Sequence, residues 1–304
     1  MRRLSPRFGL LLAGLAAFTA SVPAAADRVL HEERSLYSQI VVRESRNTIC
    51  LQFSVRHAQR NQTCINPKRP EELLFAYTRM AMTSLLYTPE PESILVVGLG
   101  GGTLPMAFTS LFPDVHIDSI EIDPAVVDVA EAYFGFQATQ RNVVHTQDAR
   151  VWTKRAATKP RRYDIIILDA FNGEYIPEHL MTREYLEETK ALLAPGGTLI
   201  ANTFAISELY HSESATYAAV FGKFLNFSVP ESANRVIVVP GEELGWGALR
   251  TRARALAPSL KPMKVPIERY ARKLADLSND RPDWRADARV LTDQYTPANL
   301  LQGD

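Results

Sequence analysis

One stretch of the chain, residues 94–104, restricts the possible folds more than any other. The apolar run Ile94-Leu-Val-Val97 leads into Gly98-Leu-Gly-Gly-Gly102, and residues 106–112 continue with helix-like composition. A buried strand, a glycine turn and a helix start form the opening unit of a doubly wound sheet that binds a nucleotide. Glycine lets the backbone turn tightly and lets a ligand approach closely. We therefore predict an α/β fold with a ligand at this turn.

Polar residues follow each later strand of the predicted sheet. The strand-like runs are residues 115–123, 142–146, 163–168 and 197–201, and the polar residues at their ends are Glu121, Asp123, Asp148, Asp169 and Asn202. The carboxyl ends of parallel strands meet at one edge, where open α/β sheets bind ligands. An acid roughly twenty residues after the glycine turn can accept the hydroxyls of a ribose. Both Glu121 and Asp123 fit this position.

The N-terminus has the layout of a secretory signal peptide. Residues 1–7 are basic, residues 8–22 are apolar, and small residues at 24–26 precede Asp27. The sequence thus predicts export, with a periplasmic location, after removal of residues 1–26. An uncleaved anchor is one alternative, and a misassigned start site, which would leave the protein in the cytoplasm, is another.

The mature chain divides into three predicted parts. Residues 27–89 contain a β-rich segment and a linking helix at 70–87, residues 90–245 form the nucleotide-binding domain, and residues 246–304 form a helical tail. Cys50 and Cys64 flank a predicted hairpin, so they could form a disulfide or remain two buried thiols. After the fifth strand we expect a helix at 208–226 and a strand at 235–239.

The charge composition of the chain limits the kinds of partner that it can bind. Lys and Arg number 34, as do Asp and Glu, so the formal net charge is zero and no basic footprint for nucleic acid is visible. The histidines lack partners at metal-binding spacing, so we predict no metal site.

In its order of motifs the chain resembles the spermidine synthase (polyamine aminopropyltransferase) family. The resemblance rests on the glycine turn at 98–104, Glu121-Ile-Asp123, Gln147-Asp-Ala149, Leu168-Asp169 and Pro195-Gly-Gly197. It covers residues 35–301 and is most specific at 94–202. It implies a class I S-adenosylmethionine-dependent methyltransferase-like (Rossmann-like) fold and, as in the family, a homodimer.

The resemblance also implies roles for the polar residues. Gly98, Gly100 and Gly102 would pass under decarboxylated S-adenosylmethionine as co-substrate, Glu121 would bind its ribose, and Asp148 would accept from its adenine. Asp169 matches the family's catalytic aspartate and would act as the base. An amine with a pKa near about 10 must lose a proton before it can attack a sulfonium, which is why a carboxylate is wanted there.

Several positions depart from the family pattern. Gly100 and Asn172 stand where family members carry aspartates, and Tyr77-Thr-Arg79 replaces Tyr-His-Glu. Tyr77 and Asn172 remain candidate contacts to an amine acceptor. Each lost charged hydrogen bond would cost about 1.5–3 kcal/mol, so we expect weakened binding of diamines. Glu174 and Glu178 are candidate replacements.

Three functions are consistent with these residues. The first is aminopropyl transfer to an amine of altered or relaxed specificity. The second is methyl transfer from S-adenosylmethionine to another nucleophile on the same scaffold. The third is an exported, non-catalytic binding protein with the same fold. A nicotinamide dehydrogenase fits less well, because Thr103 occupies the position of a required glycine.

Overall fold

The computed structural model describes residues 27–55, 58–171, 176–205, 209–278 and 282–296. It contains a seven-stranded sheet in the order β10-β11-β9-β8-β5-β6-β7 and a four-stranded sheet in the order β1-β2-β3-β4. The strands of the larger sheet are β5 (Ser93–Val97), β6 (His116–Glu121), β7 (Asn142–Thr146), β8 (Tyr163–Leu168), β9 (Leu193–Phe204), β10 (Leu225–Ser228) and β11 (Asn234–Val239). This sheet confirms the predicted doubly wound α/β fold of the class I methyltransferase type.

Strand direction in the larger sheet follows that fold. Five neighbouring strands pair in parallel, in the sheet order β9-β8-β5-β6-β7. Strand β11 pairs antiparallel with both β9 and β10. Strand β5, which leads into the glycine turn, lies between β6 and β8. The chain therefore reverses its winding direction at β5, and a crevice opens at the carboxyl ends of β5 and its neighbours.

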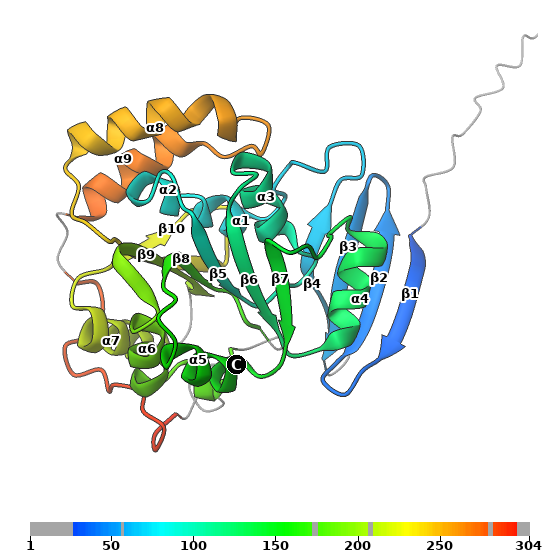
Figure 1. The fold of residues 1–304 in the computed structure, drawn as a ribbon, viewed down its shortest axis with the longest axis horizontal. Coiled ribbons are helices and arrows are strands. Elements are labelled where there is room, and N and C mark those ends of the chain that lie inside the picture. The colour runs from blue at the N-terminus through cyan, green and yellow to red at the C-terminus, as the bar shows by residue number, and fades with distance from the viewer. Residues whose placement is uncertain (1–26, 56–57, 172–175, 206–208, 279–281, 297–304) are drawn as a thin grey trace, which may run out of the picture.

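Helices cover both faces of the larger sheet (Figure 1). One face packs against α1 (Ala76–Ala81), α2 (Ser84–Tyr87), α3 (Thr103–Leu111), α8 (Trp246–Leu260) and α9 (Ile267–Leu277). The other face packs against α5 (Ala149–Ala157), α6 (Arg183–Lys190) and α7 (Leu209–Phe221). Strands buried on both faces explain the almost continuous Val, Ile and Leu runs of β5 and β8.

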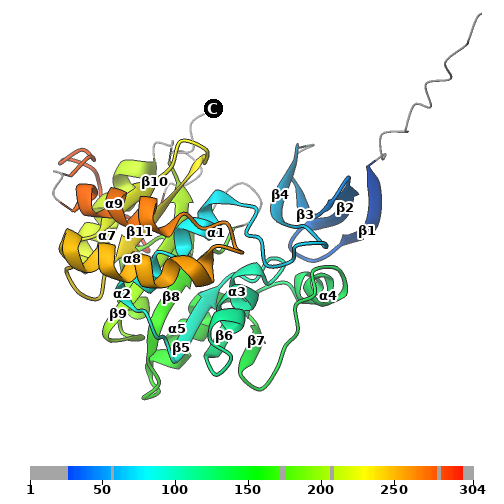
Figure 2. The same ribbon diagram turned by 90° about the horizontal axis from the view of Figure 1, so that it is seen from above.

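The smaller sheet lies beside the larger one, against α4 (Pro124–Tyr133), as Figure 2 shows. Its strands are β1 (Arg28–Arg34), β2 (Gln39–Ser45), β3 (Thr48–Val55) and β4 (Ala58–Ile65). Ile40, Val42 and Leu51 of this sheet pack with Val126 and Val129 of α4. This contact holds the smaller sheet over the carboxyl end of β6.

Some elements differ from the sequence-based prediction. The helix expected at 70–87 consists of the two short helices α1 and α2, and both pack on the larger sheet rather than with the N-terminal strands. The helix expected at 208–226 ends at Phe221, and residues 225–228 form β10 instead. Leu225 and Phe227 of β10 are buried against α9, a contact that local periodicity does not reveal.

In the part of the chain that the structure describes, no helix is long and apolar enough to span a membrane.

Candidate active site

A cavity lies at the carboxyl ends of β5, β6, β8 and β9. Its volume is about 650 Å³. Its walls come from the glycine turn, the strand-end acids, helix α1 and strand β4 of the smaller sheet. Gly98, Gly100, Glu121, Asp148, Asp169 and Tyr77 all line it, so the fold brings most of the predicted site residues together.

The glycine turn forms the floor of the cavity. Gly98 has φ +98°, and a Cβ there would overlap the backbone carbonyl of Asp169. Gly98 therefore permits both the turn and the close contact between the ends of β5 and β8. Gly100 is different, because a Cβ there would meet only Cβ of Thr63, at 3.9 Å. A side chain at position 100 would occupy space above the turn. Gly102 precedes α3 as its N-cap, behind the turn.

Glu121 and Asp123, equivalent by sequence, have different environments. Asp123 is 3% exposed, caps α4 by accepting from Ala125 N at 3.1 Å, and accepts from Ser35 Oγ at 2.5 Å. Glu121 is half-buried and accepts from Leu99 N at 3.0 Å on Oε2. Burial raises the pKa of Glu121, although bonds from backbone N–H groups oppose this shift. Glu121 is thus the acid with room to accept further hydrogen bonds from a ligand in the cavity.

Asp148 has two partners. It caps α5 by accepting from Val151 N at 2.9 Å, and its Oδ2 lies 2.9 Å from Nε2 of His179. His179 belongs to the short 3-10 helix η1 (Glu178–Leu180) and also lines the cavity. Sequence reasoning assigned no role to His179, because the two residues are 31 positions apart and meet only in the folded chain.

Asp169 follows β8 and accepts a hydrogen bond from the neighbouring strand. Asn202 near the end of β9 donates from Nδ2 to Oδ1 over 2.8 Å. The pKa of Asp169 is raised to about 7. Burial is the largest cause and the charge of Glu121 also raises the pKa, whereas the interactions with Asn202 and with the Tyr77 hydroxyl lower it. A carboxyl group with this pKa can accept a proton and release it near neutral pH.

One end of the cavity differs from the pattern that the resemblance predicts for diamine enzymes. Arg79 lines the cavity, and its Nη1 donates to the carbonyls of Leu73 and Leu74 at 2.7 and 2.9 Å. A fixed cation therefore stands where the resemblance predicts an acid. Pro177 and His179 line the cavity. Glu178, which stands between them in the sequence, is not one of the described residues that line it. Asn172 and Glu174 lie outside the described residues.

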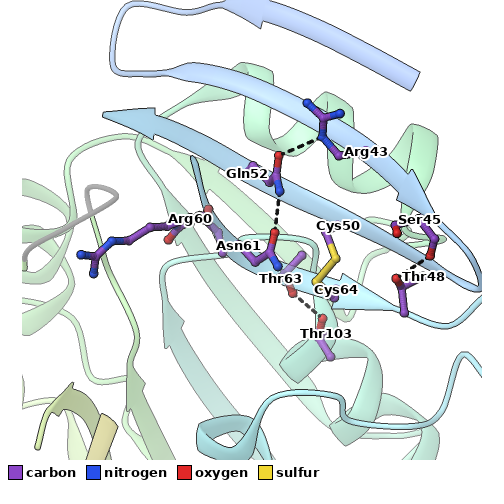
Figure 3. The surroundings of a disulfide bond; sticks show 11 residues. Arg43, Ser45, Thr48, Cys50, Gln52, Arg60, Asn61, Thr63, Cys64 and Thr103 are labelled. Carbon is purple, nitrogen blue, oxygen red and sulfur yellow. Dashed lines mark hydrogen bonds between the residues drawn. A yellow bond between two sulfur atoms is a disulfide. The ribbon is translucent and has the colours of Figure 1, made fainter. Parts of the chain in front are cut away.

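The smaller sheet covers the glycine turn through a cross-linked hairpin (Figure 3). Cys50 of β3 and Cys64 of β4 form a disulfide, and Thr63 beside it contacts the turn. Oγ1 of Thr63 lies 2.9 Å from Oγ1 of Thr103 at the start of α3. The disulfide thus stands one residue from the contact between the hairpin and the turn.

Among the described residues, no group of three or more His, Cys, Asp or Glu side chains could hold a metal ion.

Comparison with known proteins assigns this arrangement to a family. The profile of the spermine/spermidine synthase domain matches residues 74–246. A polyamine aminopropyltransferase of Vibrio vulnificus is 50% identical over 281 residues, which cover 90% of this chain and 91% of the relative. The chain belongs to the spermine/spermidine synthase family. The predicted resemblance is confirmed.

Solved structures agree with the fold. The structure of a probable spermidine synthase from Corynebacterium glutamicum matches this chain with a TM-score of 0.64 and 23% sequence identity. The match covers 86% of this chain and 98% of the synthase chain. Human methyltransferase-like protein 13, solved in complex with SAH, has a TM-score of 0.51 at 27% identity and covers 71% of this chain and 96% of its own. Aminopropyltransferases and methyltransferases thus share this scaffold. The family assignment favours aminopropyl transfer over the two alternatives, methyl transfer and a non-catalytic binding protein.

Proposed function

We propose that this protein transfers an aminopropyl group from decarboxylated S-adenosylmethionine to an amine. Family membership supports the reaction class, and the environment of Asp169 supports the chemistry. The single observation that carries the proposal is the Asp169 carboxylate, which accepts a hydrogen bond from Asn202 in the cavity that Tyr77, Glu121 and Asp148 also line.

Each residue has a role in the proposed reaction. Glu121 accepts from the ribose hydroxyls, Asp148 accepts from the adenine amino group, and the glycine turn lies beneath the nucleotide. Asp169 takes a proton from the ammonium of the acceptor. The free amine then forms a new N–C bond while the C–S bond breaks, and the sulfonium becomes the neutral thioether methylthioadenosine. A carboxylate close to the sulfonium also favours binding of that positive centre.

The acceptor is proposed to be an amine without a tightly bound second ammonium group. The Arg79 guanidinium lines the cavity and would repel a second cation, and Gly100 supplies no acid to hold one. Tyr77 and Asn172 are the proposed neutral contacts to the acceptor. Activity measured across monoamines, diamines and amino acids tests this point. A strong preference for a short diamine would contradict it.

Calorimetric titration of residues 27–304 tests the site itself. The ligands are S-adenosylmethionine, its decarboxylated form and methylthioadenosine, each repeated with Asp148→Ala. We expect micromolar binding that the substitution abolishes, with a preference for the decarboxylated nucleotide. A preference for S-adenosylmethionine would instead favour methyl transfer, and absence of binding by all three would leave the non-catalytic alternative.

We also propose export through residues 1–26, a periplasmic location and a homodimer. The basic, apolar and small-residue segments at the N-terminus support export, and the dimer is proposed by analogy with the family. N-terminal sequencing of the protein from fractionated cells should find a chain that begins at Asp27 in the periplasm. A cytoplasmic chain that begins at neither Met1 nor Asp27 would point to a misassigned start site, and an intact N-terminus in the membrane would point to an uncleaved anchor. Size-exclusion chromatography with light scattering tests the dimer.

A further inference from the structure

We infer that Asn234 is a positioning residue for this reaction, because it fixes the side-chain amide of Asn202 in the orientation that donates to Asp169. The inference rests on the proposed function, in which Asp169 is the base. Asn234 does not touch Asp169 in this arrangement but acts through Asn202. The sequence gives no sign of this role, since Asn234 opens β11 and shares no motif with the catalytic segment.

The three residues form a hydrogen-bonded chain. Nδ2 of Asn234 donates to Oδ1 of Asn202 at 2.9 Å, and Nδ2 of Asn202 donates to Oδ1 of Asp169 at 2.8 Å. In the antiparallel pair β9–β11, Asn202 faces Val236 and Asn234 faces Phe204. The two asparagines are therefore diagonal neighbours on one face of the sheet, a separation that such side chains can bridge. Both line the cavity.

An asparagine amide has a donor end and an acceptor end, so its orientation matters. With Asn234 donating to Oδ1 of Asn202, the amino group of Asn202 points to Asp169 and stabilises the carboxylate. A flipped amide would place Oδ1 of Asn202 against Oδ1 of Asp169. These two acceptors repel unless Asp169 carries a proton. Asn234 therefore favours the ionised, basic form of Asp169.

The scaffold beneath this chain is rigid. Arg235, next to Asn234, is 1% exposed, donates to Thr203 Oγ1 at 2.7 Å and pairs with Glu213 at 2.7 Å. Thr203 follows Asn202, so the buried arginine joins β9 to β11 at the same level of the sheet. Groups fixed on paired strands hold their geometry better than groups on loops. This network fixes the backbone positions from which both asparagine side chains extend.

Other groups also act on Asp169. The Tyr77 hydroxyl from α1 lowers the pKa of Asp169 and so favours its ionised form, whereas the charge of Glu121 from β6 opposes its ionisation. Among the residues that the structure describes, the remaining charged or titratable ones of the cavity wall are Tyr37, Arg60, Arg79, Asp123, Asp148, His179 and Glu231. All of these are unchanged in the variants below, so a shift in the titration of Asp169 reports on the asparagine pair.

The test replaces the donor with an acceptor. In Asn234→Asp, the new carboxylate repels Oδ1 of Asn202 and attracts its amino group, which reverses the amide. We expect the pKa of Asp169 to rise by about one unit or more, a tenfold change in proton affinity. Two readouts apply: the acidic limb of kcat/KM against pH, and ¹³C NMR titration of the Asp169 carboxyl, assigned with Asp169→Asn. The NMR titration requires no turnover, so it decides the inference even if aminopropyl transfer is not detected.

A double-mutant cycle separates amide orientation from the added charge. In the Asn202→Ala background there is no amide to reverse, so Asn234→Asp should then shift the pKa of Asp169 much less than in the wild type. Equal shifts in both backgrounds would show a simple charge effect and overturn the inference. Asn234→Ala adds no charge and should give a smaller rise, which provides a second measurement if Asn234→Asp folds poorly. Ser232→Ala removes the hydrogen bond that Asn234 N donates to Ser232 Oγ, keeps the Asn234 side chain, and should leave the titration unchanged.

Discussion

Nδ2 of Asn202 lies 2.8 Å from Oδ1 of Asp169, so the end of β9 supplies a donor to the acid at the end of β8. The two strands are parallel neighbours, and Leu168 pairs with Ala201. Each polar residue is therefore the one that directly follows a paired position. A donor on a partly buried carboxylate keeps part of its population ionised, which a proton acceptor requires.

Removing the carboxylate tests the role of Asp169. Asp169→Asn keeps the size of the side chain but cannot accept a proton from an ammonium. We expect kcat to fall by about 100- to 10,000-fold, the usual contribution of a general base. Affinity for methylthioadenosine, which carries no sulfonium, should change little. Steady-state kinetics and calorimetry measure both, and exposed Asp128→Asn on α4 is the matched control. A variant with wild-type kcat would exclude Asp169 as the base.

The pH dependence of activity follows from the same carboxyl group. Burial raises the pKa of Asp169 to about 7, so the protonated, inactive form predominates below that pH. We expect kcat/KM to decline as pH falls through about 7. Tyr77→Phe removes a donor that lowers this pKa, so the acidic limb should move to higher pH. An acidic limb near pH 4 in the wild type would argue against the buried environment.

Gly98 and Gly222 provide a matched pair for stability. Both have positive φ, +98° and +74°, but a Cβ at Gly98 would overlap the Asp169 carbonyl, whereas at Gly222 nothing lies within 4 Å. Gly222→Ala should lower the free energy of unfolding by about 1–2 kcal/mol, the cost of a left-handed backbone. Gly98→Ala should cost more and also weaken nucleotide binding. Urea denaturation compares the two, and equal losses would contradict the close contact at Gly98.

The disulfide offers a test of the hairpin over the glycine turn. Cys50 and Cys64 are 14 positions apart, so their cross-link closes a short loop. Loss of such a link costs about 3 kcal/mol in the chain-entropy model. We expect Cys50→Ser with Cys64→Ser to lower the denaturation midpoint and to bind the nucleotide less tightly, since Thr63 beside Cys64 contacts the turn. Reductant should weaken the wild type in the same way. If it also weakened the double variant, the effect would not come from this bond.

The hydrophobic pattern and the glycine turn were sufficient to predict the fold class and three acidic residues that line the cavity. Runs such as Ile165–Leu168 are apolar throughout because their strands are covered on both faces. Parallel strands end at a common edge, so Glu121, Asp148 and Asp169 had to lie near one another once the strands were recognised. These properties depend on neighbours in the chain, which is why the sequence by itself determined them.

Tertiary packing decided the remainder. The bond from Ser35 buries Asp123 and leaves Glu121 as the accessible acid, although the two are equivalent in an alternating strand. His179 reaches Asp148, and Asn234 reaches Asn202, only because distant segments pack together. Strand β10 exists because Leu225 and Phe227 are buried under α9, against the helical pattern of the residues before it. Such contacts join positions tens of residues apart, and local sequence carries no record of which ones will meet.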